Sequence, residues 1–114
     1  MIAPMCLFCR ILEGQVLATT VAETPLSLAF RDIDAKAPTH VLVIPRRHVP
    51  DLGELAEYPD ELADVVALAA RVADDEGLDH GYRMVANTGA GAGQTVFHAH
   101  LHLLGGRELT WPPG

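Results

Sequence analysis

Apolar residues and histidines alternate from Phe97 to Leu103, where every second residue is a histidine. Successive side chains of a β-strand point to opposite faces, so this pattern predicts a strand with one histidine face and one apolar face. The histidines are His98, His100 and His102, and the residues predicted to face a core are Phe97, Ala99, Leu101 and Leu103. Neighbours on one face lie roughly 6.5–7 Å apart along a strand, so the imidazoles can converge on one small group such as a metal ion or a phosphate.

Four further segments have the apolar and β-branched composition of strands, namely residues 15–23, 26–33, 40–45 and 81–87. The segment from His40 to Pro45 is almost continuously apolar, which is typical of a strand buried on both faces. Pro45 cannot donate to a ladder and should end that strand. The pair Thr24-Pro25 indicates a turn between the first two strands.

Residues 52–76 are predicted to form one long helix, because apolar residues recur there at three- and four-residue steps while acidic residues occupy the other face. Asp60, next to Pro59, is a candidate N-cap, and Gly77 is a candidate C-cap. A short helix is predicted to begin near Cys6 and to end at Gly14.

Composition and charge limit the class of protein. The chain has 114 residues, 49% of them hydrophobic, which is enough for one domain over residues 1–114. A formal net charge of −7 argues against general nucleic-acid binding, which requires a basic face, but it allows one small anionic ligand. Pro4 and Arg10 interrupt the apolar N-terminus, and no stretch approaches the ~20 apolar residues of a membrane span. We therefore expect a cytoplasmic protein with no membrane partner.

The pair Cys6 and Cys9 stands at the start of the predicted short helix, where i,i+3 neighbours can direct both sulfurs to one ligand. In a reducing compartment such a pair is a metal half-site or a redox couple rather than a structural disulfide. Two buried thiols with no partner are the third possibility, and the spacing alone does not decide between them.

A glycine-rich loop, residues 87–93, leads directly into the histidines. Its glycines allow backbone N–H groups to approach an anion closely, although a flexible turn has the same composition. The histidines suit either metal catalysis or covalent transfer, in which the middle one, His100, attacks phosphorus. The glycine loop favours the phosphate chemistry. Asp32 could accept a ligand hydroxyl or simply initiate a turn, and Arg46 and Arg47 are expected in a solvated turn.

The stretch from Gln94 to Leu104 fits the pattern His-φ-His-φ-His-φφ, in which φ is apolar and Ala99 is a small φ. In this stretch the chain resembles the histidine triad (HIT) family, and more narrowly its Hint branch of purine nucleoside phosphoramidases. The resemblance continues through residues 6–12, 28–33, 37–45, 81–89 and 104–107 and into the closing Trp111-Pro112-Pro113-Gly114. It implies an α+β fold, an antiparallel five-stranded sheet with one long and one short helix, which dimerises.

The resemblance also implies roles for individual residues. His100 would be the nucleophile that forms a nucleotidyl-histidine intermediate, and His102 would contact the α-phosphate. His98 and His40 would be the supporting catalytic histidines. The nucleotide-binding residues would be Phe30, Asp32, Ile33, Asn87, Gly93, Gln94, Thr95, His100 and His102. Asp32 would hold the ribose, Phe30 and Ile33 the base, and the loop residues the phosphate and leaving group. Thr95 departs from the serine frequent in Hint proteins.

Some bacterial relatives hold a structural zinc ion, and the matching residues here are Cys6, Cys9, His48 and His98. The resemblance thus implies a structural zinc and no cofactor for catalysis. It implies a homodimer formed by the long helix and the following strand, with the tail around Trp111 reaching the partner's site.

The leading hypothesis is hydrolysis of P–N-linked purine nucleoside monophosphates. One alternative is hydrolysis of dinucleoside polyphosphates, as in a sister branch of the family. Another is a non-catalytic dimeric adaptor that retains nucleotide affinity.

Overall fold

The fold is an antiparallel five-stranded sheet with helices, as predicted, in a computed structural model that describes residues 5–114. The strand order is β1-β2-β3-β5-β4. The strands are β1 (Thr20–Glu23), β2 (Ser27–Arg31), β3 (Thr39–Pro45), β4 (Tyr82–Val85) and β5 (Leu101–Gly105). The helices are α1 (Leu7–Leu12), α2 (Leu52–Leu55) and α3 (Pro59–Asp75), with a 3₁₀ turn at Ala90–Ala92. Among residues 5–114, no helix is long and apolar enough to cross a membrane.

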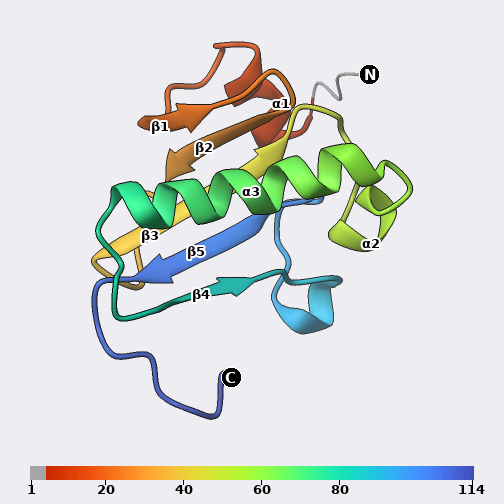
Figure 1. Ribbon diagram of the computed structural model, residues 1–114. Helices are drawn as coiled ribbons and strands as arrows, with labels where there is room; N and C mark the ends of the chain where they lie inside the picture. The colour runs from red at the N-terminus through yellow and green to blue at the C-terminus, as the bar shows by residue number, and fades with distance from the viewer. Residues whose placement is uncertain (1–4) are drawn as a thin grey trace.

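The central strand β3 is buried on both faces and divides the core into two parts. Figure 1 shows α3 lying across the front of the sheet. Val41 and Val43 belong to the larger part of the core, which contains the buried face of α3. Leu42 and Ile44 belong to the smaller part, which contains Phe8 of α1. Because alternate residues of a strand point to opposite faces, α1 and α3 cover opposite sides of the sheet.

The prediction of one continuous helix over residues 52–76 is wrong, because the chain leaves helical geometry before Pro59 and forms two helices, α2 and α3. Proline clashes with helical geometry at the residue before it, and Tyr58 accordingly has φ −123° and ψ 73°. The helix restarts with Pro59 in its first turn, so the N-cap is Tyr58, which makes no side-chain cap, and Asp60 is not the cap. The C-terminal prediction is confirmed: Gly77 has φ 71°, and the amides of Gly77 and Leu78 donate to the carbonyls of Asp74 and Ala73.

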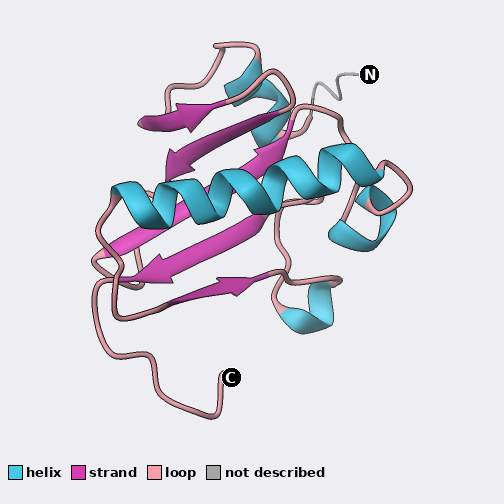
Figure 2. Cartoon of the chain, in the orientation of Figure 1, coloured by secondary structure: helices cyan, strands magenta, loops and turns pink. Residues whose placement is uncertain are grey.

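The first predicted strand and the histidine strand are both shorter than expected. The amides of Gln15 and Val16 donate to the carbonyl of Arg10 and wrap around the end of α1, so β1 begins only at Thr20. Figure 2 shows that a loop leads into β5, which begins at Leu101. Phe97 lies in this loop and is 49% exposed, so its predicted core position is wrong.

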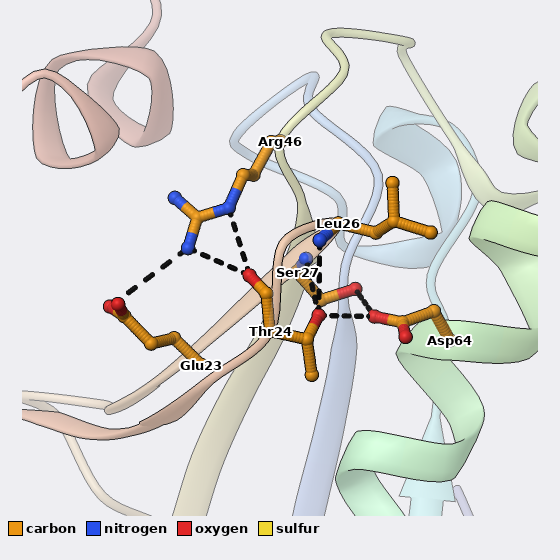
Figure 3. A network of polar contacts seen from close by, with 6 residues as sticks. All are labelled: Glu23, Thr24, Leu26, Ser27, Arg46 and Asp64. Carbon is orange, nitrogen blue, oxygen red and sulfur yellow. Dashed lines mark hydrogen bonds and ion pairs between the residues drawn. The ribbon is translucent and has the colours of Figure 1, made fainter.

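A polar network fastens α3 to the turn between β1 and β2 (Figure 3). Asp64 Oδ2 accepts hydrogen bonds from Thr24 Oγ1 at 2.5 Å and from Ser27 Oγ at 2.6 Å. Arg46 donates from Nε and Nη2 to the Thr24 carbonyl at 3.1 and 2.9 Å. The sequence analysis expected Arg46 in a solvated turn. In the structure its side chain instead holds the turn between β1 and β2.

We expect Asp64→Ala to lower the free energy of unfolding by about 1–2 kcal/mol, because two hydroxyls, one of them on fully buried Ser27, lose their acceptor. Denaturant titration measures the change. Asp74→Ala, at an exposed acid on the same helix, is the matched control and should stay within about 0.5 kcal/mol of the parent. Equal stabilities of the two variants would contradict the prediction.

Candidate functional site

A cavity of about 610 Å³ lies on the α1 side of the sheet, and three of the histidines line it. These are His40 of β3, His102 of β5 and His100 just before β5. Of the other predicted binding residues, Phe30, Asp32, Ile33, Asn87 and Thr95 also line it. The site thus combines residues that are up to 106 positions apart in the sequence, from Leu7 to Pro113.

The tautomer of His100 follows from its backbone partner. Its ring Nδ1 lies 2.7 Å from the carbonyl oxygen of His98. A carbonyl oxygen can only accept, so Nδ1 carries the proton and Nε2 has the lone pair. The edge of the Phe8 ring packs on this imidazole, with the ring centroids 5.1 Å apart. His100 is therefore held with an unprotonated nitrogen, the form that a nucleophile or base requires.

His102 has the opposite tautomer, and His40 imposes it. The amide of Lys36 donates to His40 Nδ1 at 3.0 Å, so the proton of the neutral His40 ring is on Nε2. This Nε2 lies 3.0 Å from His102 Nδ1 and 3.3 Å from Asp32 Oδ2. His102 therefore accepts at Nδ1 and carries its own proton on Nε2. The rings of His100 and His102, 5.0 Å apart, offer the cavity one acceptor and one donor.

Burial keeps these rings neutral, which the tautomer assignment requires. Burial, with smaller contributions from the neighbouring His100 and His40, lowers the pKa of His102 to about 4, and Asp32 opposes the shift. Burial likewise lowers the pKa of His40, again opposed by Asp32. Both imidazoles are accordingly uncharged at neutral pH.

The side chain of His98 is turned away from this cavity and toward the cysteines. It is fully buried, and its Nε2–H donates to the carbonyl of Pro45 at 2.8 Å. Its Nδ1 lone pair lies 3.5 Å from Cys6 Sγ, 3.6 Å from Cys9 Sγ and 3.2 Å from His48 Nδ1. Only the backbone carbonyl of His98 reaches His100.

These four side chains fit a metal ion. The donor atoms of Cys6, Cys9, His48 and His98 all lie within 4.8 Å of one another. A tetrahedral site with Zn–S of about 2.3 Å and Zn–N of about 2.0–2.1 Å separates its ligand atoms by roughly 3.3–3.8 Å, close to the distances found here. The cluster could bind a metal ion. The alternative of two thiols with no partner does not hold, because both sulfurs contact histidines.

Asp32, His40 and His102 form a second group of similar spacing. Here the amide of Lys36 already occupies the Nδ1 lone pair of His40. A neutral imidazole has one lone pair, so His40 Nε2 is a donor and not a ligand. This group is a hydrogen-bond relay, whereas the cysteine cluster directs a free lone pair at its centre.

The glycine loop differs from the expectation at Gln94. Its side chain is 4% exposed and bonds backbone groups: Oε1 accepts from the amide of Gly89 at 2.8 Å, and Nε2 donates to the carbonyls of Pro50 and Val96 at 2.7 and 3.0 Å. Gly93 has φ 91°, a conformation that favours glycine, and it closes the turn without lining the cavity. Asn87 and Thr95 are the residues of this region that reach the cavity.

Asp32 has the turn role, one of the two that the sequence left open, and its second carboxylate oxygen lies beside the cavity. Its Oδ1 accepts from the amide of Asp34 at 2.8 Å, as a turn-initiating aspartate does, while Oδ2 faces His40. Phe30 is buried against Phe8, with centroids 5.6 Å apart, and Ile33 is fully exposed at the cavity mouth.

Several cavity residues were missed by sequence reasoning. They include Lys36, Leu42, Val85, Leu104 and Pro113. Lys36 orients His40 through its backbone amide. Nearly every residue type has such an amide, so the sequence could not indicate this role. Pro113 brings the C-terminal tail to the cavity of its own chain, while Trp111 is 82% exposed.

Comparisons with known proteins agree on one family. A family model described as the HIT domain matches residues 13–109. An uncharacterized HIT-like protein of Synechococcus elongatus is 47% identical over 95% of this chain and 96% of its own. A HIT family hydrolase from Legionella pneumophila is 48% identical, with a TM-score of 0.87 over 96% of this chain and 99% of that one. A HIT family hydrolase from Clostridium thermocellum is 39% identical, with a TM-score of 0.90 over 95% and 96%.

The lowered pKa of His102 predicts acid sensitivity. The unfolded chain binds a proton at this histidine near pH 6.5 and the folded chain only near pH 4, so stability present above pH 6.5 is lost as the pH falls toward 4. We expect this residue to contribute on the order of 2 kcal/mol to that loss. Denaturant titrations from pH 7 to 4 should show a shallower fall in His102→Asn than in the parent. The fall should be unaltered in His80→Asn, at an exposed histidine; parallel curves for all three proteins would refute the prediction.

Proposed function

The chain belongs to the HIT family, and we propose that it hydrolyses P–N-linked purine nucleoside monophosphates through a nucleotidyl-histidine intermediate on His100. The observation that carries this proposal is the opposed pair of tautomers in one cavity. His100 retains a lone pair on Nε2, while His102 carries a proton on Nε2. A displacement at phosphorus requires a nucleophile and, beside it, a donor for the charge that develops on the phosphoryl oxygens.

In the first step, His100 Nε2 attacks phosphorus, the P–N bond to the amine breaks, and the amine leaves with one proton taken up from the solvent. In the second step, water attacks the phosphorus bonded to His100. The nucleoside monophosphate leaves, a proton is released, and the imidazole is regenerated. His102 donates its Nε2–H to the phosphoryl group in both steps, while the relay from the Lys36 amide through His40 keeps that proton on Nε2. His98 supports the reaction through its backbone carbonyl.

The rest of the cavity suits a nucleoside monophosphate. Phe30 and Ile33 supply apolar surface for the base, and the carboxylate of Asp32 can accept from ribose hydroxyls. Asn87 and Thr95 offer polar groups on the phosphate and leaving-group side. Gly93 and Gln94 contribute by shaping the loop, because the Gln94 side chain is engaged with backbone.

The proposal includes a structural zinc ion held by Cys6, Cys9, His48 and His98, whose donor types and spacing suit zinc. Such an ion ties α1 to the loop after β3 and to the triad. The reaction itself needs no metal, since His100 is the nucleophile. The proposal places the protein in the cytoplasm, a reducing compartment in which cysteines that form no disulfide stay reduced.

The proposal also includes a homodimer formed through α3 and β4. Among the described strands, β4 lies at one end of the sheet and pairs with β5 only, so its other edge is available to a second copy. Val66 of α3 and Tyr82 of β4 are large apolar residues, each more than 40% exposed.

Replacing the nucleophile tests the reaction. We expect His100→Ala to lower kcat for an adenosine phosphoramidate by roughly 10³-fold or more, because no other cavity nitrogen has a free lone pair. Amine release measures the rate. Radiolabelled substrate should leave a covalent nucleotide on the parent protein but not on the variant.

His80→Ala is the matched control for this test and should turn over like the parent, since His80 is exposed and lies outside this cavity. Much faster cleavage of a dinucleoside polyphosphate than of the phosphoramidate would overturn the substrate assignment. Absence of amine release by the parent protein would overturn the proposal that the protein is an enzyme of this kind.

The C-terminal tail should govern selectivity rather than assembly. Deleting residues 111–114 removes Pro113 from the cavity but leaves α3 and β4 intact, so the dimer should persist while kcat/KM for two different amine leaving groups changes unequally. Sedimentation and parallel kinetics of both proteins provide the measurement. A monomeric intact protein, or an unchanged ratio after truncation, contradicts this expectation.

A further inference from the structure

The peptide unit between His98 and Ala99 is hydrogen-bonded on both sides. Its carbonyl accepts from His100 Nδ1 at 2.7 Å, and its amide donates to the carbonyl of Val49 at 2.8 Å. This unit lies before the β5 ladder begins at Leu101. Its orientation therefore depends on these local bonds and on the side chains next to it.

Two of the four cluster residues flank that hydrogen bond. His98 immediately precedes the amide of Ala99, and His48 immediately precedes the carbonyl of Val49. Their Nδ1 atoms lie 3.2 Å apart inside the cluster. A metal ion bound to both rings would hold the two backbone segments together at this point.

The loop that contains His48 and Val49 is also bonded to the segment that contains Gln94, next to Thr95 of the cavity. The carbonyl of Pro50, two residues after His48, accepts from Gln94 Nε2 at 2.7 Å. On the other side of the cluster, Cys6 and Cys9 flank Phe8, whose ring packs on both His98 and His100 at centroid distances of 5.9 and 5.1 Å. These two routes lead from the cluster to His100 and to the loop beside it.

We propose that the cluster of Cys6, Cys9, His48 and His98 is a control point for catalysis, in which metal occupancy fixes the tautomer and direction of His100 through the His98–Ala99 peptide. His98 is then a positioning residue, acting through its carbonyl. Without the metal the peptide can rotate, the Nδ1 proton of His100 loses its fixed acceptor, and a fraction of the molecules lack the lone pair on Nε2. This inference rests on the proposed role of His100 for its effect on turnover, but the tautomer can be measured without substrate.

The test compares the zinc-loaded parent, the same protein after chelation, and His48→Gln, which removes a ligand outside α1 and outside the triad. Long-range ¹H–¹⁵N NMR reads the tautomer of His100 in the free protein. Cobalt(II) absorption reports whether the thiolates bind metal. We expect one Nδ1–H tautomer with zinc and a mixture without it, and kcat lower by roughly tenfold or more while KM changes by less than about threefold.

Val72→Ala is the control, because Val72 is fully buried against the opposite face of the sheet and contacts none of the cluster. It should lower stability and leave the His100 tautomer and kcat unchanged. If it alters them as His48→Gln does, general loosening explains the effect and the proposal fails. A folded zinc-free protein with a single His100 tautomer and parental kcat also overturns it.

If the zinc-free forms do not fold, cadmium replaces chelation. Its longer bonds to sulfur and nitrogen keep the cluster closed but change its spacing, so the His100 Nδ1–H resonance and kcat should both shift. Identical spectra and rates with zinc and cadmium would refute the coupling. Failure of the proposed function looks different: an active His100→Ala would reject the nucleophile while leaving the tautomer result intact.

Discussion

A neutral imidazole has one N–H and one lone pair, and in this protein backbone groups decide which ring nitrogen has which. The carbonyl of Pro45 assigns His98, the carbonyl of His98 assigns His100, and the amide of Lys36 assigns His40 and, through it, His102. Each backbone group has a fixed role as donor or acceptor, so the assignment leaves no choice to the side chains. The difference between a metal-binding nitrogen, a nucleophile and a donor follows from this constraint alone.

The sheet holds two of the groups that take part in these assignments. β3 is buried on both faces, and its ends supply His40 and the Pro45 carbonyl. The side of the sheet covered by α3 contributes hydrophobic packing, since its core is formed by aliphatic residues, most of them on α3, β3 and β5. The histidines of the cavity and the cysteine cluster lie on the other side of the sheet, beside α1. The cost of this arrangement is burial of several imidazoles, which depresses the pKa of His98 and His102 to about 4.

His98 connects two sites that the sequence does not separate. The regular spacing of the triad suggests three equivalent side chains, but the first ring faces the cysteines while its carbonyl faces the second ring. The two sites are therefore adjacent along the chain and opposite in direction. A structural centre and a reactive one can share a residue because backbone and side chain of that residue point to different places.

The sequence by itself determined most of the strands, the buried nature of β3 and the grouping of Ala99, Leu101 and Leu103 in the core, because these depend on the periodicity of neighbouring residues. The α+β fold and the antiparallel sheet were expected from the resemblance to the HIT family. The sequence also contains Pro59, which marks the break between α2 and α3, although one continuous helix was predicted there. Only the tertiary structure decided that Phe97 is exposed, that the Gln94 side chain bonds backbone groups, and that Lys36 orients His40. The physical reason is that these outcomes depend on contacts between distant segments, several of them made by backbone atoms, which every residue type supplies alike.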